Sequence, residues 1–162
     1  MKVLITGGAG YLGTVLTEEI LNRFPYAKVI IYDNLMYKQD GLFSFFKYPK
    51  DRFEFVYGDV RDKNCLLEQL QKLDKNNDYV IPLAAIVGFP ACARDERLAT
   101  AVNFEHVKYI VQSTKCRIIY PNTNSGYGVS DGEAHCTEET PLAPISVYGR
   151  TKCDAEEWVL GA

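Results

Sequence analysis

The sequence lacks an excess of basic residues, a long hydrophobic run and any closely spaced pair of cysteines. Its 18 lysines and arginines are balanced by 21 acidic residues, so no basic stripe favours nucleic acid or an anionic membrane as a partner. No apolar run approaches the ~20 residues of a membrane span, and the amino terminus is typical of a core strand rather than of a signal peptide. These absences predict a cytoplasmic protein.

Cysteine and histidine are too sparse to suggest a metal site or a disulfide framework. The five cysteines contain no CxxC pair, and their odd number favours reduced structural thiols. Of the two histidines, His106 falls in a helical pattern, and His135 lies beside Cys136 in a polar loop. Neither histidine has a partner at the spacing of metal ligands, so no metal is expected.

Short apolar strand patterns alternate with amphipathic helical patterns along the whole chain, without a repeat or a linker. This alternation predicts a single α/β domain, 1–162, built as a doubly wound parallel sheet between two layers of helices. Strands are expected at 3–5, 28–32, 53–57, 78–81 and 117–120, and helices at 11–24, 62–73 and 94–114.

An aromatic stretch, residues 42–48, separates the second and third predicted strands. It is too apolar to lie free in solvent. The sequence favours a short helix packed on the sheet edge, with a subunit contact or a ligand contact as the alternative.

A glycine-rich turn follows the first strand and opens the first helix: Thr6-Gly7-Gly8-Ala9-Gly10-Tyr11-Leu12-Gly13. A pyrophosphate needs backbone N–H groups and a helix N-terminus close to it, which a turn without side chains permits. The turn predicts a dinucleotide site of the Rossmann type. We expect the following helix to bury one face, made by Leu12, Val15, Leu16, Ile20 and Leu21.

Asp33 ends the second strand and is followed by Asn34. A carboxylate at this place accepts hydrogen bonds from both ribose hydroxyls and repels a 2'-phosphate, so NAD is favoured over NADP. The alternative is a strand-end cap or turn residue.

Other candidate residues follow the later strands, because ligands of open parallel sheets lie across the carboxyl ends of the strands. Asp59 and Val60 follow the third strand, and Asp59 could meet the adenine amino group. Leu83, Ala84 and Ala85 follow the fourth and would let a cofactor lie close. Each segment could also be a plain turn.

Tyr148 and Lys152 lie four residues apart in the last predicted helix, which places them on one face. A nearby cation favours the phenolate, so such a tyrosine can act as a base. Thr123 and Ser125 follow the fifth strand and bring hydroxyl groups to the same edge.

Taken together, these motifs resemble the extended short-chain dehydrogenase/reductase family, the NAD-dependent epimerases and dehydratases of nucleotide sugars. The resemblance runs through nearly the whole chain. It rests on TGGAGYLG at 6–13, YDNL at 32–35, GDVRD at 58–62, LAA at 83–85, Asn103, TEETPLAP at 137–144 and YGRTK at 148–152.

The resemblance implies catalytic roles for three residues. Tyr148 would take a proton from a sugar hydroxyl while hydride passes to the nicotinamide. Lys152 would lower the pKa of Tyr148 and hold the nicotinamide ribose. Thr123 would hydrogen-bond the reacting oxygen, with Ser125 as the alternative. The implied cofactor-binding residues are Gly7, Gly10, Tyr11, Leu12, Gly13, Asp33, Asn34, Asp59, Val60, Leu83, Ala84, Ala85, Tyr148 and Lys152.

Departures from the family pattern narrow the expected activity to a 4-epimerase or a 4-dehydrogenase. Sugar 4,6-dehydratases of this family carry an Asp-Glu pair after the active-site threonine, whereas Thr123 is followed by Asn124 and Ser125. The position before Leu83, commonly histidine, is Pro82.

Length is a further departure, since family members run to roughly twice this size and bind the sugar through a C-terminal domain. We therefore expect no substrate domain here, and an exposed sheet edge that associates with a second copy or with the missing C-terminal portion. A non-catalytic NAD-binding module, or an inactive fragment of a longer enzyme, is the alternative.

Overall fold

The computed structural model describes residues 1–129 and 135–162. Five strands form one parallel sheet in the order β3-β2-β1-β4-β5. The predicted doubly wound parallel sheet is therefore confirmed. The strands are β1 (Lys2–Thr6), β2 (Lys28–Asp33), β3 (Phe53–Tyr57), β4 (Tyr79–Pro82) and β5 (Arg117–Ile118).

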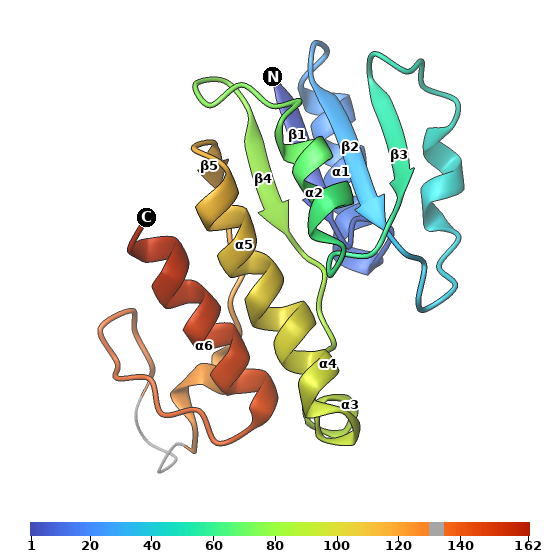
Figure 1. Ribbon diagram of the computed structural model, residues 1–162. Helices are drawn as coiled ribbons and strands as arrows, with labels where there is room; N and C mark the ends of the chain where they lie inside the picture. The colour runs from blue at the N-terminus through green and yellow to red at the C-terminus, as the bar shows by residue number, and fades with distance from the viewer. Residues whose placement is uncertain (130–134) are drawn as a thin grey trace.

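Helices cover both faces of the sheet, which completes the three predicted layers. Figure 1 shows α1 behind the sheet and α2, α5 and α6 in front of it. The helices are α1 (Tyr11–Arg23), η1 (Gly41–Phe45), α2 (Lys63–Leu70), α3 (Phe89–Arg94), α4 (Glu96–Thr100), η2 (Ala101–Glu105), α5 (His106–Ser113), η3 (Asn124–Tyr127) and α6 (Val147–Leu160). No helix among these described residues is long and apolar enough to cross a membrane.

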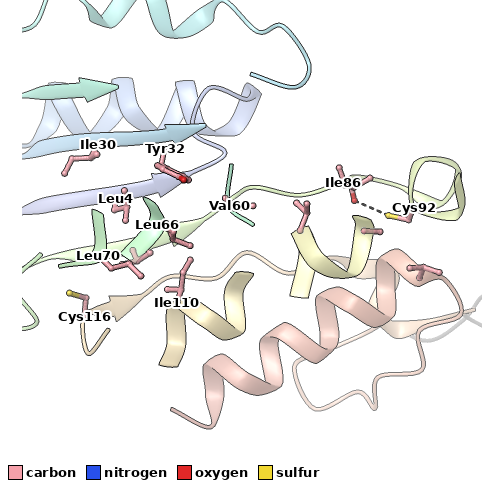
Figure 2. Close-up of a cluster of buried hydrophobic side chains, with 14 residues drawn as sticks. Leu4, Ile30, Tyr32, Val60, Leu66, Leu70, Ile86, Cys92, Ile110 and Cys116 are labelled. Atoms are coloured by element: carbon pink, nitrogen blue, oxygen red, sulfur yellow. Dashed lines mark hydrogen bonds between the residues drawn. The ribbon is translucent and has the colours of Figure 1, made fainter. Parts of the chain in front are cut away.

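The two-residue period of the central strands builds two hydrophobic cores, one on each face. Val3 and Ile5 of β1 pack toward α1, whereas Leu4 between them packs toward α2 and α5. Figure 2 shows Leu4, Ile30 and Tyr32 on the strands facing side chains of these two helices. Both faces of the inner strands are thus buried, as a parallel sheet requires.

The predicted buried face of α1 is confirmed only in part. Ile20 and Leu21 are buried and Leu16 packs against the core, whereas Leu12 and Val15 are 54% and 48% exposed, and Gly13 and Thr17 are buried in their place. A Cβ at Gly13 would lie 2.5 Å from the Cα of Gly8. Because the helix packs this closely on the turn through its glycine, the face that carries Leu12 and Val15 points away from the sheet.

The predicted helix 94–114 is interrupted. A break at Asp95 separates α3 from α4, and the Asp95 carboxylate caps α4 by accepting a hydrogen bond from the Leu98 N–H at 2.9 Å. The chain then widens into a π-helical turn, η2, before α5 begins. Within this turn the buried Asn103 amide bonds both the N–H and the carbonyl of Ile86, at 2.8 and 3.0 Å.

The fifth strand is shorter than the predicted 117–120. The Ile119 N–H still donates to the Val80 carbonyl at 3.0 Å, after which the chain leaves the ladder. Ile119 is 53% exposed at this edge of the sheet. A two-residue strand at the edge presents few unpaired backbone groups.

The aromatic stretch 42–48 forms the predicted short helix on the sheet edge. η1 buries Leu42 and Phe45 in the core on the α1 side. Phe46 then stands edge-on to Phe53 and Phe55 of β3, with ring centroids 5.8 and 6.5 Å apart. The structure thus explains how these aromatic residues are held.

Candidate functional site

A cavity of about 500 Å³ opens at the carboxyl ends of the strands. Every residue predicted to bind cofactor lines it, although these residues come from five separate segments of the sequence. They are Gly7, Gly10, Tyr11, Leu12, Gly13, Asp33, Asn34, Asp59, Val60, Leu83, Ala84, Ala85, Tyr148 and Lys152.

Several further wall residues lie outside the predicted cofactor-binding set. Gly58, Ile86, Val87, Pro121 and Asn122 belong to the strand-end segments where ligands of a parallel sheet are expected, whereas the other five were missed. All the further wall residues together are Tyr32, Met36, Tyr37, Gln39, Gly58, Ile86, Val87, Val102, Pro121 and Asn122.

The glycine-rich turn is fixed against both neighbouring strands. The Gly7 N–H donates to the Tyr32 carbonyl at 2.9 Å. Gly7 has a φ of +69°, and a Cβ there would meet the Ala84 nitrogen at 2.4 Å. Only a residue without a side chain allows the turn to approach the loop after β4 this closely.

The first turn of α1 lines the cavity, and no side chain caps its N–H groups. Its N-cap is Gly10, which has no side chain to cap the helix, and the first turn carries no acidic residue. Helix termini leave such N–H groups for an external acceptor, and the helix dipole favours an anion there. Backbone and cavity therefore fit a pyrophosphate between the turn and α1.

Asp33 joins the glycine-rich turn to the end of β2. One carboxylate oxygen accepts from the Ala9 N–H at 3.0 Å, and the other accepts from the Leu35 N–H at 2.8 Å. Each oxygen has a second lone pair available to a ligand hydroxyl. Asp33 is only 8% exposed, so a polar group from a ligand would meet it in a site with little competing water.

Asp59 faces the same cavity as an ionised, fixed carboxylate. The Arg61 guanidinium donates to both oxygens, from Nε at 2.9 Å and from Nη2 at 2.7 Å, and the Asn34 amide adds a bond at 3.1 Å. The hydrogen bond from Arg61 is the main reason that the pKa of Asp59 falls to about 2. Asp59 is thus an acceptor at all physiological pH values.

A buried histidine contacts the residue that precedes the glycine-rich turn. His106 lies against the Val102 carbonyl through Nδ1, and its Nε2 is 3.4 Å from the hydroxyl of Thr6, the residue before Gly7. Because Nδ1 faces a carbonyl it must donate, so Nε2 accepts from Thr6. Burial lowers the pKa of His106 to about 4, which keeps the ring neutral.

This histidine predicts acid sensitivity of the fold. An unfolded histidine gains a proton near pH 6.5, whereas His106 stays neutral until about pH 4, so stability falls as pH drops between these values. The expected loss is roughly 3 kcal/mol. Urea unfolding at several pH values measures it, and a His106→Asn variant should lack this component.

The exposed His135 provides the matched control for that experiment. A His135→Asn variant should keep the pH dependence of the original chain. The free energy of unfolding could instead depend equally on pH between 6.5 and 4 in the original chain and in both variants. That result would contradict the assignment of the acid sensitivity to His106.

Lys152 and Tyr148 reach the cavity from α6, but their electrostatics differ from the expectation. Burial raises the pKa of Tyr148, and the opposing effect comes from a hydrogen bond with the Thr123 side chain. Lys152 is not among the groups that shift this pKa, and its Nζ donates to the Pro121 carbonyl at 2.7 Å. Burial in turn lowers the pKa of Lys152 to about 8.

Thr123 lies behind this wall rather than on it. Its hydroxyl caps η3 by accepting from the Ser125 N–H at 3.3 Å and bonds the Ser125 hydroxyl at 3.3 Å. Neither residue lines the cavity, yet the Thr123 side chain lies close enough to the phenol to act against the effect of burial on the pKa of Tyr148. Of the two hydroxyl residues, the structure brings Thr123 to Tyr148.

The fold and this cavity together define a Rossmann-type dinucleotide-binding domain. The profile of the NAD dependent epimerase/dehydratase family matches residues 3–162. The chain belongs to that family, whose cofactor is NAD.

Relatives of known name agree with this membership. The low-salt glycan biosynthesis protein Agl12 of Haloferax volcanii is 31% identical over 171 residues, which cover 96% of this chain and 50% of Agl12. Among solved structures, the dTDP-glucose 4,6-dehydratase DesIV of Streptomyces venezuelae, with NAD bound, has a TM-score of 0.85 at 27% identity, covering 98% of this chain and 50% of DesIV.

A UDP-glucuronic acid 4-epimerase of Bacillus cereus, in complex with NAD, has a TM-score of 0.83 at 27% identity and the same two coverages, 98% and 50%. The relatives thus include both epimerases and dehydratases. The chain spans about half the length of the curated relatives it matches.

Proposed function

We propose that this chain is the NAD-binding part of a nucleotide-sugar 4-epimerase or 4-dehydrogenase. The observation that carries the proposal is a single cavity that joins three features. These are the uncapped N-terminus of α1, the Asp33 carboxylate, and the Tyr148 and Lys152 side chains. The first two suit the pyrophosphate and ribose of a dinucleotide, and the last two suit proton transfer beside its reactive end.

In this proposal each residue of the site has a separate role. NAD, when bound, supplies the hydride acceptor. Tyr148 takes the proton from the sugar hydroxyl, and Thr123, whose side chain lies near the phenol, holds the oxygen that loses it. Lys152 holds the nicotinamide ribose, and on leaving Pro121 its ammonium is the cation available to favour the phenolate.

A 4,6-dehydratase is disfavoured by the loop after β5. Elimination needs an acid and a base beside the sugar, and the residues after Thr123 are Asn124 and Ser125, which do not titrate near neutral pH. An epimerase returns the hydride to the other face of a 4-keto sugar, and a dehydrogenase releases the ketone.

The second candidate function is a non-catalytic NAD-binding module, or an inactive fragment of a longer enzyme. It is supported by the chain's length, about half that of its relatives. Hydride transfer from a nucleotide sugar discriminates the two candidates. A cytoplasmic location and association with a second copy or with a C-terminal portion stay predictions.

Calorimetric titration with NAD and NADP tests the cofactor site. We expect NAD to bind about ten- to a hundredfold more tightly, because Asp33 accepts from ribose hydroxyls and repels a 2'-phosphate. An Asp33→Asn variant should bring the two affinities within about threefold of each other. The asparagine still offers one oxygen to the backbone N–H groups that Asp33 holds.

The exposed Asp40, which does not line the cavity, gives the matched control. Its Asp40→Asn variant loses the same charge and should keep the preference for NAD. Equal binding of NAD and NADP by the original chain, or no binding of either, would overturn the proposed cofactor.

A further inference from the structure

Lys152 is held by an aromatic ring that the proposed mechanism does not use. Tyr120 follows β5, and its ring centroid lies 4.0 Å from the Lys152 Nζ. The other cation–ring pairs of the described residues are at 4.5 Å or more. Lys152 is 6% exposed, so its ammonium meets this ring with little water around it. Cation–π attraction is strongest for such a desolvated pair.

Tyr120 also holds the backbone of α6 at the same residue. Its hydroxyl donates to the Lys152 carbonyl at 3.2 Å. Burial raises the pKa of Tyr120, which keeps this hydroxyl protonated and able to donate. One side chain thus contacts both ends of Lys152, the ammonium through its ring and the backbone through its hydroxyl.

We propose that Tyr120 is a positioning residue, which holds the Lys152 ammonium charged and directed along the cavity wall. The Pro121 carbonyl supplies the only other contact of Nζ among the described residues, at 2.7 Å. A neutral carbonyl and a ring face replace the water that burial removes. Neither forms a tight ion pair, so the ammonium stays free to turn toward a ligand.

Other charged groups around Lys152 do not replace this role. Glu156, on the same helix, raises the pKa of Lys152, but burial dominates and lowers it. His106, at the start of α5, is kept neutral by its own burial. Tyr148, one helical turn away, has a raised pKa and is a neutral phenol at physiological pH.

The test measures the pKa of Lys152 in the chain without cofactor. NMR of lysine labelled at Cε monitors the titration, and the Lys152→Met variant identifies the signal of Lys152. Replacement of Tyr120 by pentafluorophenylalanine keeps the shape of the ring but removes its attraction for a cation. It should lower the pKa of Lys152 by about one unit, as should Tyr120→Leu. Tyr120→Phe, which keeps the ring face, should leave the pKa nearly unchanged.

Tyr79 offers a matched control, because it is a half-buried tyrosine beneath Arg117 on β5, outside the cavity. Tyr79→Leu should leave the pKa of Lys152 unchanged. The proposal fails if the fluorinated ring leaves that pKa unchanged, or if Tyr79→Leu lowers it as much. The fluorinated variant keeps the test decisive even where Tyr120→Leu does not fold.

The role assigned to Lys152 rests on the proposed function, and NAD titration separates the two. In the fluorinated variant, NAD affinity should fall about threefold to tenfold, because less of the ammonium is charged and in place. If the original chain binds no NAD, the proposed function is wrong, while the pKa of Lys152 still decides whether Tyr120 positions it.

Discussion

Tyr148→Phe should reduce hydride transfer from a nucleotide sugar by about a hundred- to ten-thousandfold, because it removes the proposed proton acceptor from the cavity wall. The phenylalanine keeps the ring that packs beside the core and loses only the hydroxyl. NAD affinity should therefore stay within about threefold of the original value. The transfer is measured with a panel of UDP-, dTDP- and CDP-linked hexoses, as lasting NADH absorbance for a dehydrogenase and as formation of the C4 epimer of the sugar for an epimerase.

The control for this variant is Tyr109→Phe, at a half-buried tyrosine of α5 that lies outside the cavity. It should transfer hydride at the rate of the original chain. An original chain that binds NAD but transfers no hydride from any sugar of the panel would contradict catalysis by this chain. A Tyr148→Phe variant as active as the original would instead contradict the assignment of the base.

Gly7→Ala should destabilise the fold by about 3 kcal/mol and abolish NAD binding. Two costs add at this position. The φ of +69° disfavours any residue with a Cβ, and that Cβ would lie 2.4 Å from the Ala84 nitrogen. The atoms it meets belong to the backbone, so no side chain can rotate away to relieve the clash. Urea unfolding followed by the single tryptophan measures the change.

Gly10→Ala separates stability from binding. Gly10 has a φ of −71°, which any residue adopts, and the nearest atom to a Cβ there is the Gly7 carbonyl oxygen at 3.3 Å. This variant should unfold within about 1 kcal/mol of the original chain yet bind NAD more weakly, because its methyl group adds bulk at the cavity wall. Equal stability of Gly7→Ala and the original chain would refute the steric account of the turn.

The strand and helix patterns were sufficient to predict the sheet because burial on both faces leaves long apolar runs in the sequence. They were not sufficient for the interior of the helix predicted at 94–114. There the Asn103 amide bonds the backbone of Ile86, a residue far from it in the sequence. Such a tertiary bond leaves no trace in the local periodicity, so the π-helical turn was not predicted. The break at Asp95 has a local cause, the aspartate that caps α4, which the apolar periodicity alone did not reveal.

The first half of the buried face of α1 was predicted wrongly for a related reason. Leu12 and Val15 extended the apolar pattern, but the close approach of Gly13 to Gly8 sets which face of this first half meets the sheet. A glycine contributes no hydrophobic signal to a sequence pattern. It nevertheless decides the orientation of a helix when two backbones approach this closely.

By itself, the sequence determined the order of the elements, the glycine-rich turn and the candidate residues at the strand ends, because each depends on residues adjacent in the chain. Only the tertiary structure decided how these residues act on one another. It placed Lys152 on Tyr120 and Pro121, and it made burial the dominant influence on the pKa of Tyr148. Such effects depend on desolvation and on distances between separate segments, which a sequence pattern does not encode.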